Sequence, residues 1–156
     1  MSRPILAALL LLTAAPASAA DWRLVTVDMP REVMAFADFD SIRAPDATTR
    51  TAWLLNVRRD ASPQGVGARR FETIMDCPGR RWRAVRIVTY DMRNRPIAEL
   101  EAGGESAGID AAPESIAGQL LDYVCSNGAS RPEAASMGST PPIEAARAVM
   151  ANRARR

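Results

Sequence analysis

The sequence predicts an α+β fold: an antiparallel β-sheet of about five to six strands, with one C-terminal helix packed on a face and tied by a disulfide. Three observations lead to this prediction. Residues 69–77 have the period-two pattern of a strand, a Pro-Gly turn follows directly, and apolar residues recur with helical period from Ile116 to Val124. The two cysteines, Cys77 and Cys125, stand at the ends of that strand and that helix.

The first twenty residues have the pattern of a secretory signal peptide. A basic start at Arg3 is followed by an apolar run over residues 5–13 and by the small-residue site Ala17-Ser18-Ala19. The run is shorter than the roughly 20 residues that cross a bilayer, and no cysteine follows it that could carry a lipid. We therefore expect cleavage after Ala19 or Ala20, a periplasmic or secreted protein, and no transmembrane segment in the mature chain.

Composition agrees with a folded domain, because 47% of the residues are apolar and 24% are charged. All 20 basic residues are arginine, and histidine is absent. The chain therefore lacks the usual general base near neutral pH and the commonest metal ligand. We expect no cofactor and no metal. Because the protein is exported and its body is slightly acidic, we expect no binding of nucleic acid.

Three segments in the first part of the chain are predicted strands or extended segments. Residues 22–27 form the first, and residues 31–40 form a second extended segment. Residues 51–58 form a strong strand, in which Trp53, Leu55 and Val57 lie on one side. Ala44-Pro45-Asp46 marks a turn, and the Pro- and Gly-containing residues 60–67 form a loop.

The segment from Arg69 to Cys77 is the most informative strand. Its pattern places four residues on one face: Phe71, Thr73, Met75 and Cys77. Cys77-Pro78-Gly79-Arg80 predicts a type II turn, since Pro-Gly fits the two central positions. A link this short joins antiparallel strands, so residues 81–90 form the partner strand. After a second turn, residues 97–101 form a further short strand.

The period then changes to that of a helix. One apolar stripe is formed by Ile116, Leu120, Tyr123 and Val124. Pro113 suits a first helical turn, and Asn127-Gly128 ends the helix. Two cysteines in an exported protein usually form one bridge. The expected Cys77–Cys125 disulfide ties the helix end to the strand end and fixes the helix across the apolar face of the sheet.

We divide the chain into a signal peptide (1–20), a folded domain (21–127) and a tail (128–156). The tail is rich in Ser, Ala, Gly and Pro as far as residue 142, which predicts disorder. Thr140, Pro141 and Glu144 can cap a short helix over residues 141–153. Its thin apolar stripe and basic charge fit either a frayed tail or contact with an anionic membrane.

Arginines on the predicted hairpin are the candidate binding residues: Arg69, Arg70, Arg80, Arg81, Arg83 and Arg86. They fall on two adjacent strands and the turn between them, with Trp82 and Tyr90 nearby. Such a patch can hold sulfated glycans, lipid phosphates or an acidic protein surface. The alternative is a solvated strand face whose arginines pair with acidic residues such as Glu72.

Few residues suggest catalysis. Asp38 and Asp40 share a side if extended, as a pair of glycosidase acids would, but a strand end or turn capped by Asp is the favoured interpretation. Nucleophile-elbow, phosphate-loop, zinc-protease and dinucleotide-binding motifs are absent from the sequence. We therefore expect a protein that is not an enzyme.

The chain resembles the surface-adhesin protein E family of small exported bacterial proteins over residues 22–126. The resemblance rests on the order and spacing of short motifs: a mature start near Trp22, Phe36-Ala37-Asp38-Phe39-Asp40-Ser41-Ile42, Trp53-Leu54-Leu55-Asn56-Val57, Asp76-Cys77, Arg80-Arg81-Trp82-Arg83, a strand ending at Tyr90, and Cys125 at a helix end. It implies an antiparallel sheet with a C-terminal helix tied on by a disulfide, and binding of host extracellular-matrix and serum proteins.

Three functions are compatible with these sequence features. The first is a non-catalytic exported binding protein of the adhesin E type that binds a protein or an anionic glycan through its sheet face. The second is a periplasmic enzyme inhibitor or envelope-stress factor, and the third is a hydrolase that uses Asp38 and Asp40. A homodimer formed through an open sheet edge is a further possibility.

Overall fold

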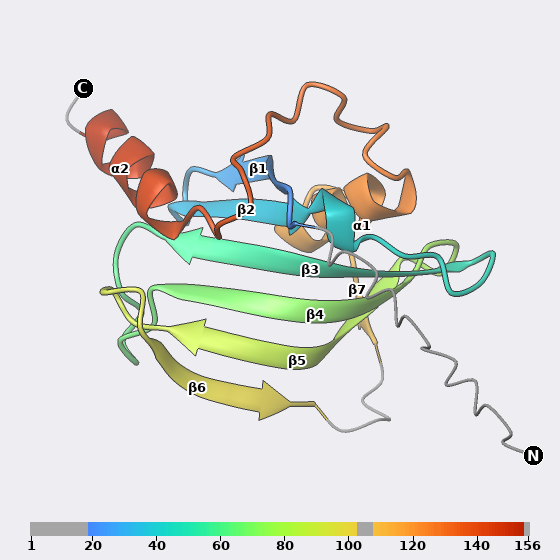
Figure 1. Ribbon diagram of the computed structural model, residues 1–156, viewed down its shortest axis with the longest axis horizontal. Coiled ribbons are helices and arrows are strands. Elements are labelled where there is room, and N and C mark those ends of the chain that lie inside the picture. The colour runs from blue at the N-terminus through green and yellow to red at the C-terminus, as the bar shows by residue number, and fades with distance from the viewer. Residues whose placement is uncertain (1–18, 103–107, 155–156) are drawn as a thin grey trace, which may run out of the picture.

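Seven strands and two α-helices make up the part of the chain that the computed structural model describes, residues 19–102 and 108–154 (Figure 1). The strands are β1 (Trp22–Asp28), β2 (Val33–Asp38), β3 (Thr49–Arg58), β4 (Ala68–Asp76), β5 (Arg81–Tyr90), β6 (Pro96–Glu101) and β7 (Ile109–Asp110). The helices are α1 (Ile116–Cys125) and α2 (Ile143–Arg153), and the short 3-10 turn η1 (Phe39–Ser41) follows β2. The predicted signal peptide lies outside the described residues, apart from residues 19 and 20.

One antiparallel sheet contains all seven strands, which confirms the predicted fold class. β1 to β6 lie side by side in chain order, and β7 pairs with the first two residues of β5. The expected extended segment 31–40 is shorter in the structure. Glu32 has φ 53° in the turn before β2, and η1 begins directly after Asp38.

The two helices cover opposite faces of the sheet. Strand β2 shows this arrangement most clearly, because all six of its residues are buried. Ala35 and Ala37 belong to the core under α1, whereas Met34 and Phe36 belong to a second core under α2. We call these two sides the α1 face and the α2 face. A strand covered on both faces is expected to be apolar at consecutive positions, as β2 is.

Helix α1 and its disulfide agree with the prediction. Ser115 is the N-cap, and its hydroxyl accepts a hydrogen bond from the Gly118 amide at 3.0 Å, so the helix begins slightly later than Pro113 suggests. Of the predicted stripe, Leu120, Tyr123 and Val124 are buried, together with Leu121, and Ile116 is partly buried. Cys77 and Cys125 are disulfide-bonded with their Cα atoms 5.7 Å apart. The bridge attaches the C-terminal end of α1 to the end of β4.

The turn between β4 and β5 differs from the prediction. A type II turn needs a positive φ at Gly79, but the residue with positive φ is Arg80, at 49°. The Arg80 amide donates to the Cys77 carbonyl at 3.4 Å, and the Gly79 amide donates to the Asp76 carboxylate at 3.1 Å. The carboxylate lies so close to Gly79 that a Cβ there would collide with it. A side chain at Gly79 would thus displace the Asp76 carboxylate from its hydrogen bond, and Gly79 itself has no left-handed conformation.

The segment after α1, expected as a tail with a short helix over residues 141–153, lies along the sheet and continues into α2. Trp22 exchanges backbone hydrogen bonds with Met137 and Gly138, and Ser136 forms a bridge with Arg23, so this segment runs along the outer edge of β1. Helix α2 then packs on the α2 face through three buried residues: Ile143, Ala146 and Met150. Within residues 19–102 and 108–154, no helix has the length and apolar character needed to cross a membrane.

Candidate binding face of the sheet

A β-bulge in β5 decides which arginines share a face. Glu72 of β4 pairs with Arg86, but the next residue, Thr73, pairs with Ala84, so Val85 is an extra residue in β5. Without this bulge, Arg86 would point to the opposite side from Arg81 and Arg83. The register instead places Arg81, Arg83 and Arg86 on the α2 face.

Four of the six candidate arginines gather there. Arg70 of β4 pairs with Val88 and lies on the same face, where β3 contributes Trp53. We define the open face as the part of the α2 face that carries Trp53, Arg70, Arg81, Arg83 and Arg86. Helix α2 packs over the β1–β3 side, against residues such as Phe36 and Leu55 (Figure 1). It reaches β5 only at the strand end, where Arg147 donates to the carbonyls of the β5–β6 turn. The open face is therefore left without a covering helix.

The other two candidate arginines lie elsewhere. Arg69 pairs with Thr89 and lies on the α1 face. Arg80 lies in the hairpin turn and donates to both carboxylate oxygens of Asp122 in α1, at 2.6 and 3.3 Å. This hydrogen bonding raises the pKa of Arg80. Arg80 thus connects the hairpin to α1, beside the disulfide, and does not extend the open face.

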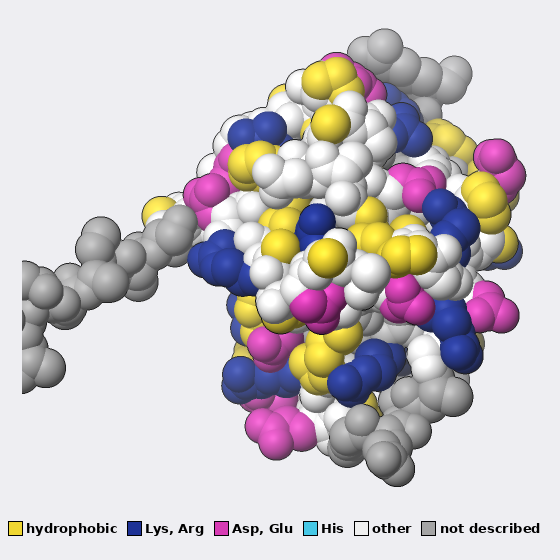
Figure 2. Space-filling view, turned by 90° about the vertical axis from the view of Figure 1, so that its right-hand side faces the viewer, with side chains coloured by type: hydrophobic (Ala, Val, Ile, Leu, Met, Phe, Trp, Pro, Cys, Tyr) yellow, Lys and Arg dark blue, Asp and Glu magenta, His cyan; other side chains and the backbone are white. Residues whose placement is uncertain are grey.

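Acidic residues divide the charge on the open face. Arg86 forms an ion pair with Glu99 of β6; this hydrogen bond is the main cause of its raised pKa, and Glu101 and Glu72 add to it. Arg81 pairs with Asp110 of β7 at 3.1 Å and donates to the Gly108 carbonyl at 2.7 Å. Basic and acidic side chains are likewise interspersed on the side of the molecule in Figure 2. The face is a mosaic of charges and not a uniform basic patch.

Two arginines of the open face have no carboxylate within 4.0 Å among the described residues, Arg70 and Arg83. The guanidinium of Arg70 stacks on the Trp53 ring, 4.6 Å from its centroid. Arg83 lines a shallow pocket of about 200 Å³ together with Ile74, Asp76 and Arg81. A guanidinium beside an apolar side chain at an open surface can accept a carboxylate or sulfate group in two parallel hydrogen bonds.

The two candidate catalytic carboxylates are used differently. Asp38 is 7% exposed, and its carboxylate accepts a hydrogen bond from the Asp21 amide at 2.8 Å, which supports the start of β1. Asp40 lies in η1, where its carbonyl accepts a hydrogen bond from Arg43. The structure does not place these two carboxylates on one extended strand, because η1 begins at Phe39.

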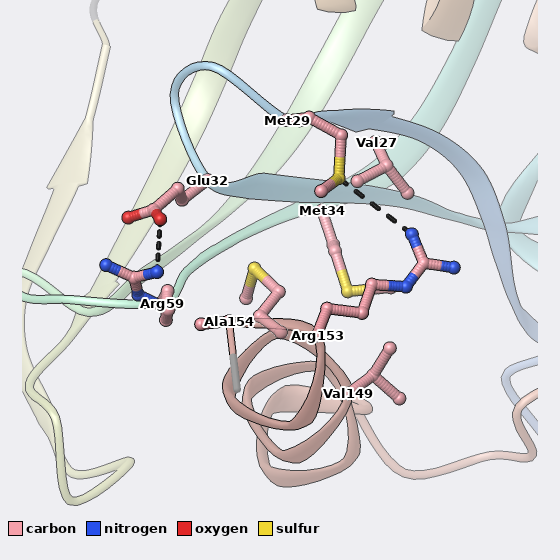
Figure 3. A pocket seen from close by; sticks show the side chains of 9 residues that line it. Val27, Met29, Glu32, Met34, Arg59, Val149, Arg153 and Ala154 are labelled. Carbon is pink, nitrogen blue, oxygen red and sulfur yellow. Dashed lines mark hydrogen bonds and ion pairs between the residues drawn. The ribbon is translucent and has the colours of Figure 1, made fainter. Parts of the chain in front are cut away.

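A second pocket lies where α2 meets the β1–β2 hairpin (Figure 3). It measures about 100 Å³ and is lined by methionines of three elements: Met29, Met34 and Met150. Arg59 pairs with Glu32 at one side, and Arg153 donates to the Met29 sulfur at 3.8 Å on another. The sequence did not indicate this pocket, because the short helix expected over residues 141–153 was not expected to pack on the sheet.

The stacking of Arg70 on Trp53 was also missed. The period-two pattern of β3 and β4 was visible in the sequence, but the contact depends on the register between the two strands. That register pairs Leu55 with Arg70, so Trp53 lies diagonally next to Arg70.

The family comparison covers the sheet and the first helix. The family model described as surface-adhesin protein E matches residues 22–126, from the first residue of β1 to the residue after α1. The matched part includes the disulfide and the whole open face, and α2 lies outside it. No curated protein and no solved structure matches the chain. The chain belongs to the surface-adhesin protein E family.

Proposed function

We propose that this protein is a non-catalytic exported binding protein that holds a protein or an anionic ligand on the open face. The observation that carries the proposal is the exposed pocket at Arg83, on a part of the sheet that neither helix covers. Membership of an adhesin family supports a surface or exported protein. The signal-peptide pattern supports export, and the absence of histidine from the sequence supports binding in place of acid–base catalysis.

The side chains of the open face suit a ligand with acidic groups, bound selectively and with moderate affinity. A planar guanidinium recognises carboxylate or sulfate groups through two donors at once. Trp53 under Arg70 adds a rigid aromatic surface, and Trp and Arg are the residues that most often dominate binding energy at interfaces. The neighbouring Glu99 and Glu101 repel anionic groups, so they select ligands whose acidic groups lie away from them. We therefore propose a patterned acidic partner, such as an acidic protein surface or a sulfated glycan.

The test compares two single substitutions that remove the same charge. The mature protein, residues 21–156, is passed over immobilised heparin and immobilised extracellular-matrix proteins, and Kd is measured by surface plasmon resonance. Arg83→Ser removes the pocket cation, and Arg93→Ser removes an exposed arginine of the β5–β6 turn. We expect about tenfold weaker binding for Arg83→Ser, from the loss of one charge-assisted hydrogen bond, and a much smaller change for Arg93→Ser.

Equal losses in the two variants would mean that binding depends only on net charge, and the open face would be rejected as the site. Arg80 stays unchanged in this experiment, because its removal would also break the contact with Asp122. Failure of the wild-type protein to bind any of these surfaces, at low salt as well as at physiological salt, would contradict an adhesin-type function.

We also propose that any homodimer formed through a sheet edge uses β6. All six β6 residues are exposed, whereas residues 136–138 cover the outer edge of β1. Light scattering of the wild type and of Glu99→Pro tests this, because the Glu99 amide faces the open edge of β6 and not β5. The variant should shift a dimer to monomer, and a dimer that persists would place the interface elsewhere.

A further inference from the structure

The α1 face holds a cleft that is separate from the open face. Two adjoining pockets lie between the start of α1 and strands β3 to β5. The outer pocket measures about 340 Å³ and the inner one about 150 Å³. Asn56, Phe71 and Ile116 line both, so the pockets form one continuous depression. It exists because α1 begins at Ile116 and leaves the adjoining sheet surface without a helix above it.

The inner pocket is apolar. Apart from Asn56, its walls are hydrophobic side chains, among them Leu54, Met75, Ala117 and Leu120. Phe71 and Trp82 meet edge to face with ring centroids 6.0 Å apart and form one side. Aliphatic and aromatic walls of this kind favour a hydrocarbon group over a polar one, since burying apolar surface is the main source of affinity in such pockets.

The outer pocket is basic. Arg31, Arg58 and Arg69 line it. Arg31 is already paired with Asp28 at 2.7 Å. Arg58 and Arg69 have no carboxylate within 4.0 Å anywhere in the described residues, so their charge is available to a ligand. The N-terminal end of α1 at Ile116 adds positive potential to the same place.

Unsatisfied polar atoms lie along the cleft. The Oδ1 atom of Asn56, the Nε atom of Arg58 and the Nε1 atom of Trp82 are buried and have no hydrogen-bond partner among the described protein atoms. Buried polar groups are usually paired, because leaving one unpaired is unfavourable. Of these three atoms, the Arg58 Nε atom is the donor that belongs to the outer pocket, where it suits an anionic headgroup.

We propose that this cleft binds a single-chain anionic amphiphile, with an acidic headgroup at Arg58 and Arg69 and an aliphatic tail in the inner pocket. The chemical class is that of a fatty carboxylate. The order of the two pockets sets the orientation, because the charged residues line the wide outer pocket and the narrow inner pocket is apolar. This proposal is independent of the open face, which lies on the other side of the sheet.

Calorimetric titration of the mature protein with decanoate tests the headgroup, with decanol and acetate as probes that lack the charge or the tail. Arg58→Gln with Arg69→Gln removes the two unpaired cations of the outer pocket. Arg93→Gln with Arg95→Gln, two exposed arginines of the β5–β6 turn, is the control with the same change in charge. We expect saturable decanoate binding, weakened about tenfold or more in the first double variant and unchanged in the second. Decanol and acetate should bind at least about tenfold more weakly than decanoate.

Ala117→Phe tests the tail site, because a larger side chain at this position fills the inner pocket. It should abolish decanoate binding and leave heparin binding by the open face intact, while circular dichroism checks the fold. Equal decanoate affinity in the two double variants, equal binding of decanol and decanoate, or the absence of saturable binding below the micelle concentration would overturn the proposal. Each of these results leaves the function of the open face untouched.

Discussion

Strands β2 and β6 each have six residues, yet all six residues of β2 are buried and all six of β6 are exposed. β2 lies between two helices and carries apolar side chains on both faces. β6 is an edge strand that contains Pro96, Glu99 and Glu101, residue types that discourage pairing with other chains. The comparison shows that the sheet is divided: β2 is covered by a helix on each face, whereas β6 is exposed along its whole length.

The largest expected effect tests this division directly. Phe36→Ala should destabilise the protein by about 3–5 kcal/mol, because Phe36 is 0% exposed and a cavity would remain. Leu100→Ala on β6, where Leu100 is 60% exposed, should change stability by less than about 0.5 kcal/mol. Urea unfolding of both variants measures the difference. Similar losses would mean that the two sides of the sheet contribute alike.

The next effect concerns the disulfide. Replacing both Cys77 and Cys125 by Ser should lower the free energy of unfolding by about 2–5 kcal/mol, since the bridge restricts the unfolded chain and holds α1. Thermal melts under oxidising conditions measure the loss. Wild-type protein under reducing conditions is the control and should show the same decrease. Coincident melting curves for the oxidised wild type and the variant would contradict a stabilising bridge.

A smaller effect tests whether α2 belongs to the folded unit. Met150→Ala removes a buried side chain from the core under α2 and should cost about 2 kcal/mol, at the low end for such changes because the helix lies near the chain end. Val149→Ala is the matched control, since Val149 is exposed. If both variants melt with the wild type, α2 makes no net contribution to stability.

The smallest effect is electrostatic. A hydrogen bond from the Thr48 amide, supported by bonds from Thr49, lowers the pKa of Asp46 from 3.8 to about 2. Because the folded-state pKa is below the unfolded one, the associated stability is present above pH about 4 and disappears as the pH falls through about 2. Asp46→Asn should lack this dependence. The measurement is the melting temperature of both proteins between about pH 2 and pH 5, a range that contains the two pKa values. Parallel curves for the two proteins would contradict a lowered pKa at Asp46.

Much of the fold follows from local patterns that the sequence contains. The period-two pattern around Thr73 and Met75, the short link at Pro78-Gly79 and the stripe of α1 each specify an element without knowledge of the rest. The cysteine pair then joins two of these elements. The sequence indicated a short helix over residues 141–153 but not that it packs on the sheet, because its own apolar stripe is thin. The evidence for this packing was in β2, where Met34 and Phe36 alternate with Ala35 and Ala37. A strand that is apolar on both faces is expected to be buried on both faces.

The sequence by itself determined the elements, the antiparallel hairpin, the disulfide and the face on which α1 packs, because each depends on residues that are close together or on only one possible partner. Only the tertiary structure decided which arginines share a face of the sheet. The bulge at Val85 places Arg86 on the same face as Arg81 and Arg83. Arg80 instead pairs with Asp122 of α1, 42 positions away in the sequence. Register and long-range ion pairs depend on how the elements meet, and no single segment encodes that.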